Sequence, residues 1–265
     1  MFVTPPRQKR RTKASFASAT TSADPGPVSY TLDLRDHASR VAAWTMGEGP
    51  TVMLVHGWGG SAADMAPLAA AFARAGHRAV LFDMPGHGRS SGRESSLVDF
   101  LRAMRSVSGA LGVPDAIVGH SFGGTAAVFA VTELGLPTRG TVLVSPAPGP
   151  AYFADRFVRA VGLPAERATG MLRRVVERVG RSVESLDAVV AARSATVPAL
   201  ILHDPDDREV PWRYAAAMAD AWRGSVLVPA PALGHKRILR DPATIAAAVD
   251  FVRALPSAGA RSRSA

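Results

Sequence analysis

A serine between two glycines is the arrangement in this chain with the clearest chemical potential. Residues 117–124 read Ile-Val-Gly-His-Ser-Phe-Gly-Gly, so Ser121 lies between Gly119 and Gly123, where an apolar run gives way to a helix-like pattern. On such a strand–turn–helix junction, the nucleophile elbow, the serine hydroxyl stands clear of the backbone. Side chains at the two glycine positions would clash with the strand or the helix. We therefore expect Ser121 to be a nucleophile.

A serine hydroxyl needs a base to remove its proton, and the base needs an acid to orient it. Among the seven histidines, His235 lies between the last predicted strand and the last predicted helix, in a loop that can reach Ser121. We predict His235 as the base. Residues 203–211 read His-Asp-Pro-Asp-Asp-Arg-Glu-Val-Pro. From this run we predict Asp207 as the orienting acid, with Asp204, closer to the strand end, as the alternative.

Negative charge on a reacting carbonyl oxygen is stabilised by two backbone N–H groups, the oxyanion hole. The residue after the nucleophile, Phe122, begins a predicted helix and is expected to supply one of them. The second is expected from Trp58 in the run His-Gly-Trp-Gly-Gly at 56–60, which follows a short apolar strand. Its glycines allow the backbone to approach a substrate closely.

Strands and helices alternate along most of the chain, which predicts an α/β fold with a mostly parallel, doubly wound sheet. The first two strands are expected to form a hairpin around a polar turn at 36–39. Functional residues gather at the carboxyl ends of such strands, where Ser121, the 56–57 turn and Asp83 are expected. The expected strands are 28–34, 40–45, 51–55, 78–82, 115–119, 141–145, 199–203 and 225–228, and the expected helices are 64–75, 97–111, 121–134, 212–222 and 242–255.

The stretch from about 146 to 196 interrupts this alternation. It predicts a short helical cap insertion above the sheet, rather than a crossover, with helices at 151–161, 165–179 and 183–192. Its eight arginines could meet an acidic substrate, although a solvated arginine-rich surface is the simpler interpretation. Its candidate pocket walls are Tyr152, Phe153, Phe157, Leu163, Met171 and Leu172.

Composition narrows the class of protein. A chain of 265 residues with 47% hydrophobic content suits one large domain, here 28–255, whose core needs no disulfide bond or metal ion for stability. The net charge of +9 comes mainly from basic segments at 1–27 and 256–265, which we expect to be disordered, so +3 remains for the domain and nucleic acid is not an expected partner. The absence of cysteine favours a cytoplasmic protein, and no apolar run is long enough to span a membrane. The oligomeric state is left open.

Five ordered blocks resemble the α/β-hydrolase superfamily, in particular its short-capped, esterase-like serine hydrolases. The resemblance covers residues 28–255 and implies a Ser121–His235–Asp207 triad, with Trp58 and Phe122 in the oxyanion hole and neither cofactor nor metal. The loop after Asp83 shapes the site in such relatives without being catalytic. The blocks are His56-Gly57-Trp58-Gly59-Gly60, Asp83-Met84-Pro85-Gly86-His87-Gly88-Arg89-Ser90, Gly119–Gly124, Asp207 with Val210-Pro211, and Gly234-His235.

The expected reaction is cleavage of a small-molecule carboxylic ester or thioester through an acyl-enzyme. The same triad also fits hydrolysis of lactones, amides or carbon–carbon bonds, and acyl transfer. An alternative hypothesis, of a non-enzymatic function, is that the protein is a receptor or signalling protein that binds a small ligand on this fold.

Overall fold

The structure is a computed structural model that describes residues 27–34, 40–164, 166–182 and 184–256. The turn predicted at 36–39 lies outside these residues, as do the tails predicted at 1–27 and 256–265 apart from one boundary residue each. Predictions about them stay predictions. No helix in the described part of the chain combines the length and apolar character needed to cross a membrane.

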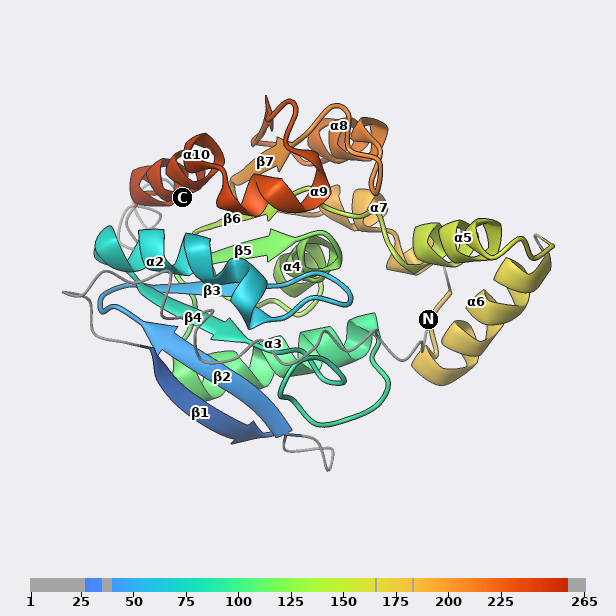
Figure 1. Cartoon of the computed structure of the whole chain (residues 1–265), viewed down its shortest axis with the longest axis horizontal. Helices are drawn as coiled ribbons and strands as arrows, with labels where there is room; N and C mark the ends of the chain where they lie inside the picture. Colours follow the sequence, from blue (N-terminus) through green and yellow to red (C-terminus); the bar gives the residue numbers. More distant parts are fainter. Residues whose placement is uncertain (1–26, 35–39, 165, 183, 257–265) are drawn as a thin grey trace.

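One twisted sheet runs through the molecule (Figure 1). In the described residues it has eight strands in the order β1-β2-β4-β3-β5-β6-β7-β8. β1 and β2 form an antiparallel hairpin, β2 pairs antiparallel with β4, and the remaining pairs are parallel, which confirms the predicted sheet. The strands are β1 (Val28–Asp33), β2 (Arg40–Met46), β3 (Thr51–Val55), β4 (Arg78–Phe82), β5 (Ala116–His120), β6 (Gly140–Val144), β7 (Ala199–His203) and β8 (Ser225–Pro229).

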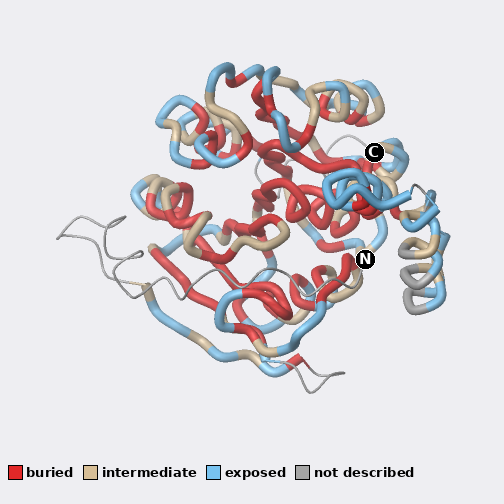
Figure 2. The backbone as a smooth tube through the Cα atoms, turned by 45° about the vertical axis from the view of Figure 1, so that its right-hand side comes forward, coloured by how far each residue is buried: buried red, intermediate tan, exposed pale blue. Residues whose placement is uncertain are grey.

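Helices cover both faces of the sheet and bury two hydrophobic cores, seen as the interior of Figure 2. Successive side chains of a strand point to opposite faces, so in β3 Met53 and Val55 enter one core while Val52 and Leu54 enter the other. The helices α3 (Leu97–Leu111), α4 (Phe122–Thr132), α7 (Ala188–Ala192) and α8 (Trp212–Ala221) contribute to the first core. The segments η1 (Ala62–Met65), α2 (Ala66–Arg74), η3 (Ile238–Arg240) and α10 (Pro242–Ala254) contribute to the second.

The segment between β6 and β7 differs from the predicted insertion. Only α5 (Pro150–Ala160) and α6 (Glu166–Val179) project from the body (Figure 1). After η2 (Glu184–Leu186), α7 packs against α4 and α8 with Ala188 and Ala192 fully buried. α7 is therefore the crossover helix between β6 and β7. Five residues are too few for a helical period to separate it from the cap in the sequence.

Candidate active site

Ser121 occupies the turn between β5 and α4, and its backbone φ is +52°. This conformation is uncommon for a residue with a side chain, and it is retained where the surroundings enforce it. A Cβ on Gly119 would lie 2.5 Å from the Gly123 carbonyl oxygen, and a Cβ on Gly123 would lie 2.3 Å from the Val55 carbonyl oxygen. The clash predicted at both glycines is thus confirmed, with helix α4 at Gly119 and with the end of β3 at Gly123.

His235 and Asp207 form a hydrogen-bonded pair. His235 lies in the short helix α9 (Gly234–Arg237), which the sequence pattern did not predict, and its Nδ1–H donates to Asp207 Oδ2 at 2.7 Å. The other carboxylate oxygen accepts the backbone N–H groups of Glu209 at 2.7 Å and Val210 at 3.0 Å. Burial raises the pKa of Asp207, but the hydrogen bond and charge of His235 and these two amides outweigh it, leaving the pKa at about 2. Asp207 is therefore ionised at neutral pH.

The alternative acid, Asp204, has a different position. Its Oδ2 accepts the Gly234 N–H and its Oδ1 accepts the Asp206 N–H at 2.9 Å, so it contacts the backbone of the loop that carries His235. Burial acts to raise the pKa of Asp204, and hydrogen bonds from the loop amides, that of Gly234 foremost, lower it below its ordinary value. Asp204 fixes the approach of this loop to the sheet, while Asp207 contacts the imidazole.

His120, the residue before the serine, was given no role from the sequence. Its Nε2–H donates to the backbone carbonyl of His235 at 2.8 Å, and the two rings lie 4.8 Å apart between centroids. Burial, followed by the charge of His235, lowers the pKa of His120 to about 3, so the ring is neutral and keeps its donor role at neutral pH. These partners are 115 residues apart in the chain, and no local pattern could have indicated the contact.

Ser121 and His235 both line a cavity of about 570 Å³ at the carboxyl end of the parallel strands. In the described residues no hydrogen bond joins the Ser121 hydroxyl to His235. Contacts between a nucleophile and its base are often long in the free enzyme and shorten when substrate binds. The structure thus places Ser121 and His235 at one cavity, and the third predicted residue, Asp207, contacts His235 through a direct hydrogen bond without lining the cavity.

The two predicted oxyanion donors lie on neighbouring segments. A Cβ on Gly57 would lie 3.0 Å from the Ser121 Cβ, so the loop after β3 packs directly against the elbow. Neither the Trp58 nor the Phe122 N–H has a hydrogen-bond acceptor in the described part of the chain. The Trp58 indole, whose packing the sequence did not predict, makes an edge contact with the Phe122 ring at 5.5 Å and stacks on Phe100 at 6.3 Å.

Buried polar side chains hold this loop in place. His56 Nδ1–H donates to the Gly57 carbonyl at 2.7 Å, and its Nε2 accepts the Met84 N–H at 3.0 Å. Burial lowers the pKa of His56 to about 4, so it is neutral and both bonds form at pH 7. Asp83 Oδ1 accepts the Ala62 N–H at 2.7 Å. These residues shape the site and do not line the cavity.

The cap contributes less to the cavity than its apolar residues suggested. Phe153 lines it and packs edge-on against the Phe122 ring at 5.5 Å. Phe157 and Leu163 are 40% and 44% exposed, and the Met171 side chain lies outside the described residues. No group of three or more histidine, aspartate or glutamate side chains in the described residues is arranged to hold a metal ion.

Known proteins resemble the chain in sequence and in structure. The α/β-hydrolase fold family matches residues 50–163. A pimeloyl-[acyl-carrier protein] methyl ester esterase from Shewanella woodyi is 26% identical over 154 residues, which are 57% of this chain and 57% of that protein. A putative carbamate hydrolase from Variovorax paradoxus is 24% identical over 252 residues, which are 80% of this chain and 95% of that protein.

A putative lipase from Acinetobacter baumannii superposes with a TM-score of 0.71 at 18% identity, covering 91% of this chain and 94% of that one. At this identity the likeness shows the fold. Together with the family match, the elbow and the sheet order, it shows that this chain has the α/β-hydrolase fold.

Proposed function

We propose that the protein is a serine hydrolase that cleaves a carboxylic ester or thioester through an acyl-enzyme. The observation that carries this proposal is the buried 2.7 Å hydrogen bond between His235 and Asp207 beside the cavity that Ser121 lines. A carboxylate held on Nδ1 leaves Nε2 of His235 as the nitrogen that can accept a proton.

In the acylation step, the Ser121 oxygen attacks the carbonyl carbon and its proton passes to His235 Nε2. The carbonyl oxygen becomes negatively charged and accepts hydrogen bonds from the Phe122 and Trp58 N–H groups. Asp207, ionised because its pKa is about 2, stabilises the imidazolium. When the tetrahedral intermediate collapses, the bond to the alcohol or thiol breaks and the leaving group takes the proton from His235.

Deacylation repeats these roles with water. His235 removes a proton from a water molecule that attacks the acyl carbon of the Ser121 ester. The intermediate collapses by breaking the bond to the serine oxygen, which regains the proton from His235, and a carboxylic acid is released. The names of the similar proteins, an esterase and a putative carbamate hydrolase, support hydrolysis at a carbonyl carbon.

Covalent labelling tests the proposal. A fluorophosphonate probe is expected to label the purified protein stoichiometrically, and Ser121→Ala is expected to lose labelling and on the order of 10⁴-fold in esterase turnover. Ser194→Ala, which removes an exposed hydroxyl in another part of the chain, is the matched control and should retain both. A para-nitrophenyl ester series of increasing acyl length measures the depth of the pocket. A wild-type protein that binds such esters without labelling or turnover would be a ligand receptor instead.

A further inference from the structure

The wall of the cavity carries more positive than negative charge. Its charged residues are the cations Arg156, Lys236, Arg237 and Arg240 and the carboxylates Asp64 and Glu209. Asp64 already accepts the Ser61 N–H at 2.9 Å, as part of the turn that begins η1. The cavity that holds Ser121 therefore has a surplus of positive charge, which attracts anions.

The sequence suggested that cap arginines could meet an acidic substrate, and three of the eight are paired with carboxylates away from the cavity. Arg159 and Arg173 pair with carboxylates one helical turn away, Asp155 at 2.9 Å and Glu177 at 3.8 Å, and Arg181 forms a two-pronged pair with Glu133. Arg156 does reach the cavity. Its Nη1 donates to the backbone carbonyls of Arg208 and Glu209, at 2.9 and 3.1 Å.

Two other cations of the cavity have side chains without such partners in the described residues. Within the described part of the chain the side chains of Lys236 and Arg240 form no hydrogen bond or ion pair, whereas the Arg237 side chain between them is held by the carbonyls of Ala232 and Leu233 at 2.9 and 3.0 Å. Lys236 lies on α9 and Arg240 ends η3 four residues later, and both residues line the cavity. Both are exposed, while their neighbours Ile238 and Leu239 are buried.

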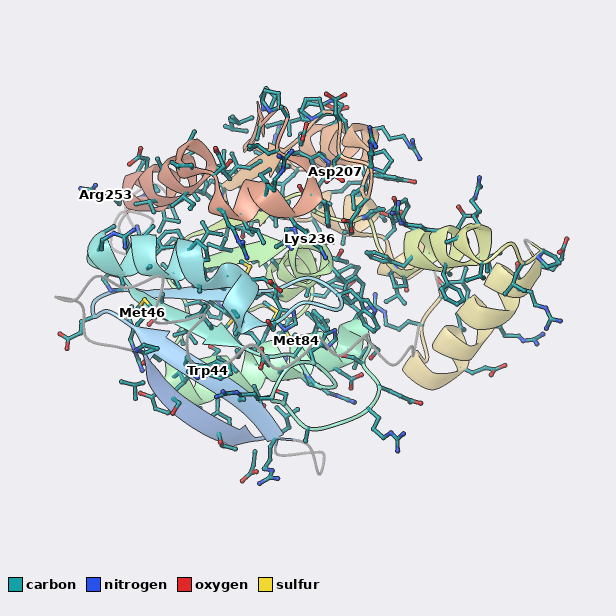
Figure 3. The ribbon with its side chains drawn as sticks, in the orientation of Figure 1. Trp44, Met46, Met84, Asp207, Lys236 and Arg253 are labelled. Carbon is teal, nitrogen blue, oxygen red and sulfur yellow. The ribbon has the colours of Figure 1, made fainter. Side chains whose placement is uncertain are left out.

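Lys236 also lies close to the reacting groups. It follows His235 directly on α9, where Figure 3 labels it, and lines the same cavity as Ser121. Its charge helps to lower the pKa of His120, after burial and the charge of His235, and His120 is the buried neighbour of the nucleophile. An anion bound by Lys236 would therefore be held beside the scissile bond.

We propose that Lys236 and Arg240 form an anion-binding subsite, so that the substrate is an ester or thioester that also carries a carboxylate or phosphate. This inference rests on the proposed hydrolase function and narrows its substrate class. The two side chains replace the water around the anion with charge-assisted hydrogen bonds, each of which strengthens binding on the order of tenfold to a hundredfold. The cavity attracts anionic esters electrostatically, and this attraction weakens with salt.

Matched ester pairs test the subsite. Wild-type kcat/KM is compared for para-nitrophenyl hydrogen adipate against para-nitrophenyl hexanoate, which places the charge on the acyl side. A second pair places the charge on the leaving-group side: butyryloxy-nitrobenzoic acid, whose carboxylate is free, is compared with the same compound in which that carboxylate is methylated. The same measurements are made on Lys236→Gln/Arg240→Gln, on Lys236→Arg, and on Arg105→Gln, a charge-removing control on α3 that does not line the cavity. Inhibition by adipate and by inorganic phosphate distinguishes carboxylate from phosphate recognition.

The expected result is a wild-type preference for the charged ester of one pair by about tenfold or more, decreasing with ionic strength. The double glutamine variant should lose this preference, measured as the ratio of the two rates within a pair, and the other two variants should retain it. Equal rates within both pairs, or a preference unchanged in the double variant, would overturn the subsite. If no ester is hydrolysed, the proposed function fails, and calorimetry of adipate binding to Ser121→Ala, with and without the two glutamine substitutions, still decides whether the subsite exists.

Discussion

Acidification from about pH 7 to about pH 5 is expected to destabilise the folded protein, because several histidines are buried in their neutral form. His56 is the clearest of them, since its Nε2 accepts the Met84 N–H while its Nδ1–H donates to Gly57. A protonated ring has no acceptor for the Met84 amide. Protonation of His56 therefore conflicts with the native hydrogen bonds as well as with burial.

The size of the effect follows from the pKa values. Burial lowers the pKa of His56 from 6.5 to about 4, so below 6.5 the unfolded chain binds a proton that the folded chain does not. Each pH unit in that window costs about 1.4 kcal/mol, which gives about 2 kcal/mol from His56 at pH 5. His87 and His120, with pKa values of about 4 and 3, add similar amounts. The stabilisation from Asp207, with its pKa of about 2, is lost only below pH 3.8 and does not contribute in this range.

Urea unfolding of the wild type and of His56→Gln, measured at several pH values, tests this reasoning. The glutamine carbonyl can still accept the Met84 N–H but does not titrate. The variant is expected to be less stable at pH 7, yet to lose about 2 kcal/mol less than the wild type between pH 7 and pH 5. Above pH 7 the two pH profiles should run parallel, which serves as the internal control. Equal losses on acidification would show that His56 does not titrate as its burial implies.

Two further substitutions test the elbow and the acid. Gly123→Ala is expected to lower the free energy of unfolding by several kcal/mol, since its Cβ would lie 2.3 Å from a backbone oxygen, whereas Gly109→Ala, in α3 with no atom within 4 Å, should raise it by about 0.5–1 kcal/mol. Urea midpoints measure both, and similar destabilisation of the two variants would refute the steric explanation. Asp207→Asn is expected to reduce kcat on the order of 10⁴-fold, because the amide disrupts the His235 tautomer, while Asp204→Asn should lose about 1 kcal/mol of stability and keep kcat within about tenfold. The kcat of each variant is measured as turnover per probe-labelled site. A larger loss of kcat in Asp204→Asn than in Asp207→Asn would assign the orienting role to Asp204.

Much of the fold could be predicted because its elements have strong local patterns. β3, β4, β7 and α3 begin and end at the predicted residues. Continuous apolar runs indicate strands buried on both faces, and Ser96 marks the start of α3 by accepting the Asp99 N–H. A helix was predicted at 183–192, but the assignment of α7 to the cap rather than to the crossover was wrong, and the short helix α9 was not predicted. They are too brief to show a period, and tertiary contacts hold them in place.

The candidate site was predictable where a residue directly follows a parallel strand, because the carboxyl ends of such strands lie at the same edge of the sheet. Ser121, Asp207 and His235 follow different strands; Ser121 and His235 line one cavity, and Asp207 bonds His235. The contact between Asp204 and the Gly234 amide, the support of the His235 carbonyl by His120, and the charge at Lys236 were not predicted. Such contacts depend on how long side chains cross between segments that lie far apart in the sequence.

The anchoring of the His235 loop has a consequence for how substrate preference can change in this protein. Asp204 at the end of β7 and His120 at the end of β5 bind the backbone of that loop, so the base is positioned by the sheet and not by the cap. The projecting helix α6 carries neither anchor, so changes there are expected to leave His235 in place, whereas changes at Arg156 on α5 would disturb the backbone beside Asp207 (Figure 1). Under the proposed function, substrate range can therefore be changed from two sides, by the cap and by the subsite residues Lys236 and Arg240, while the sheet keeps His235 in place.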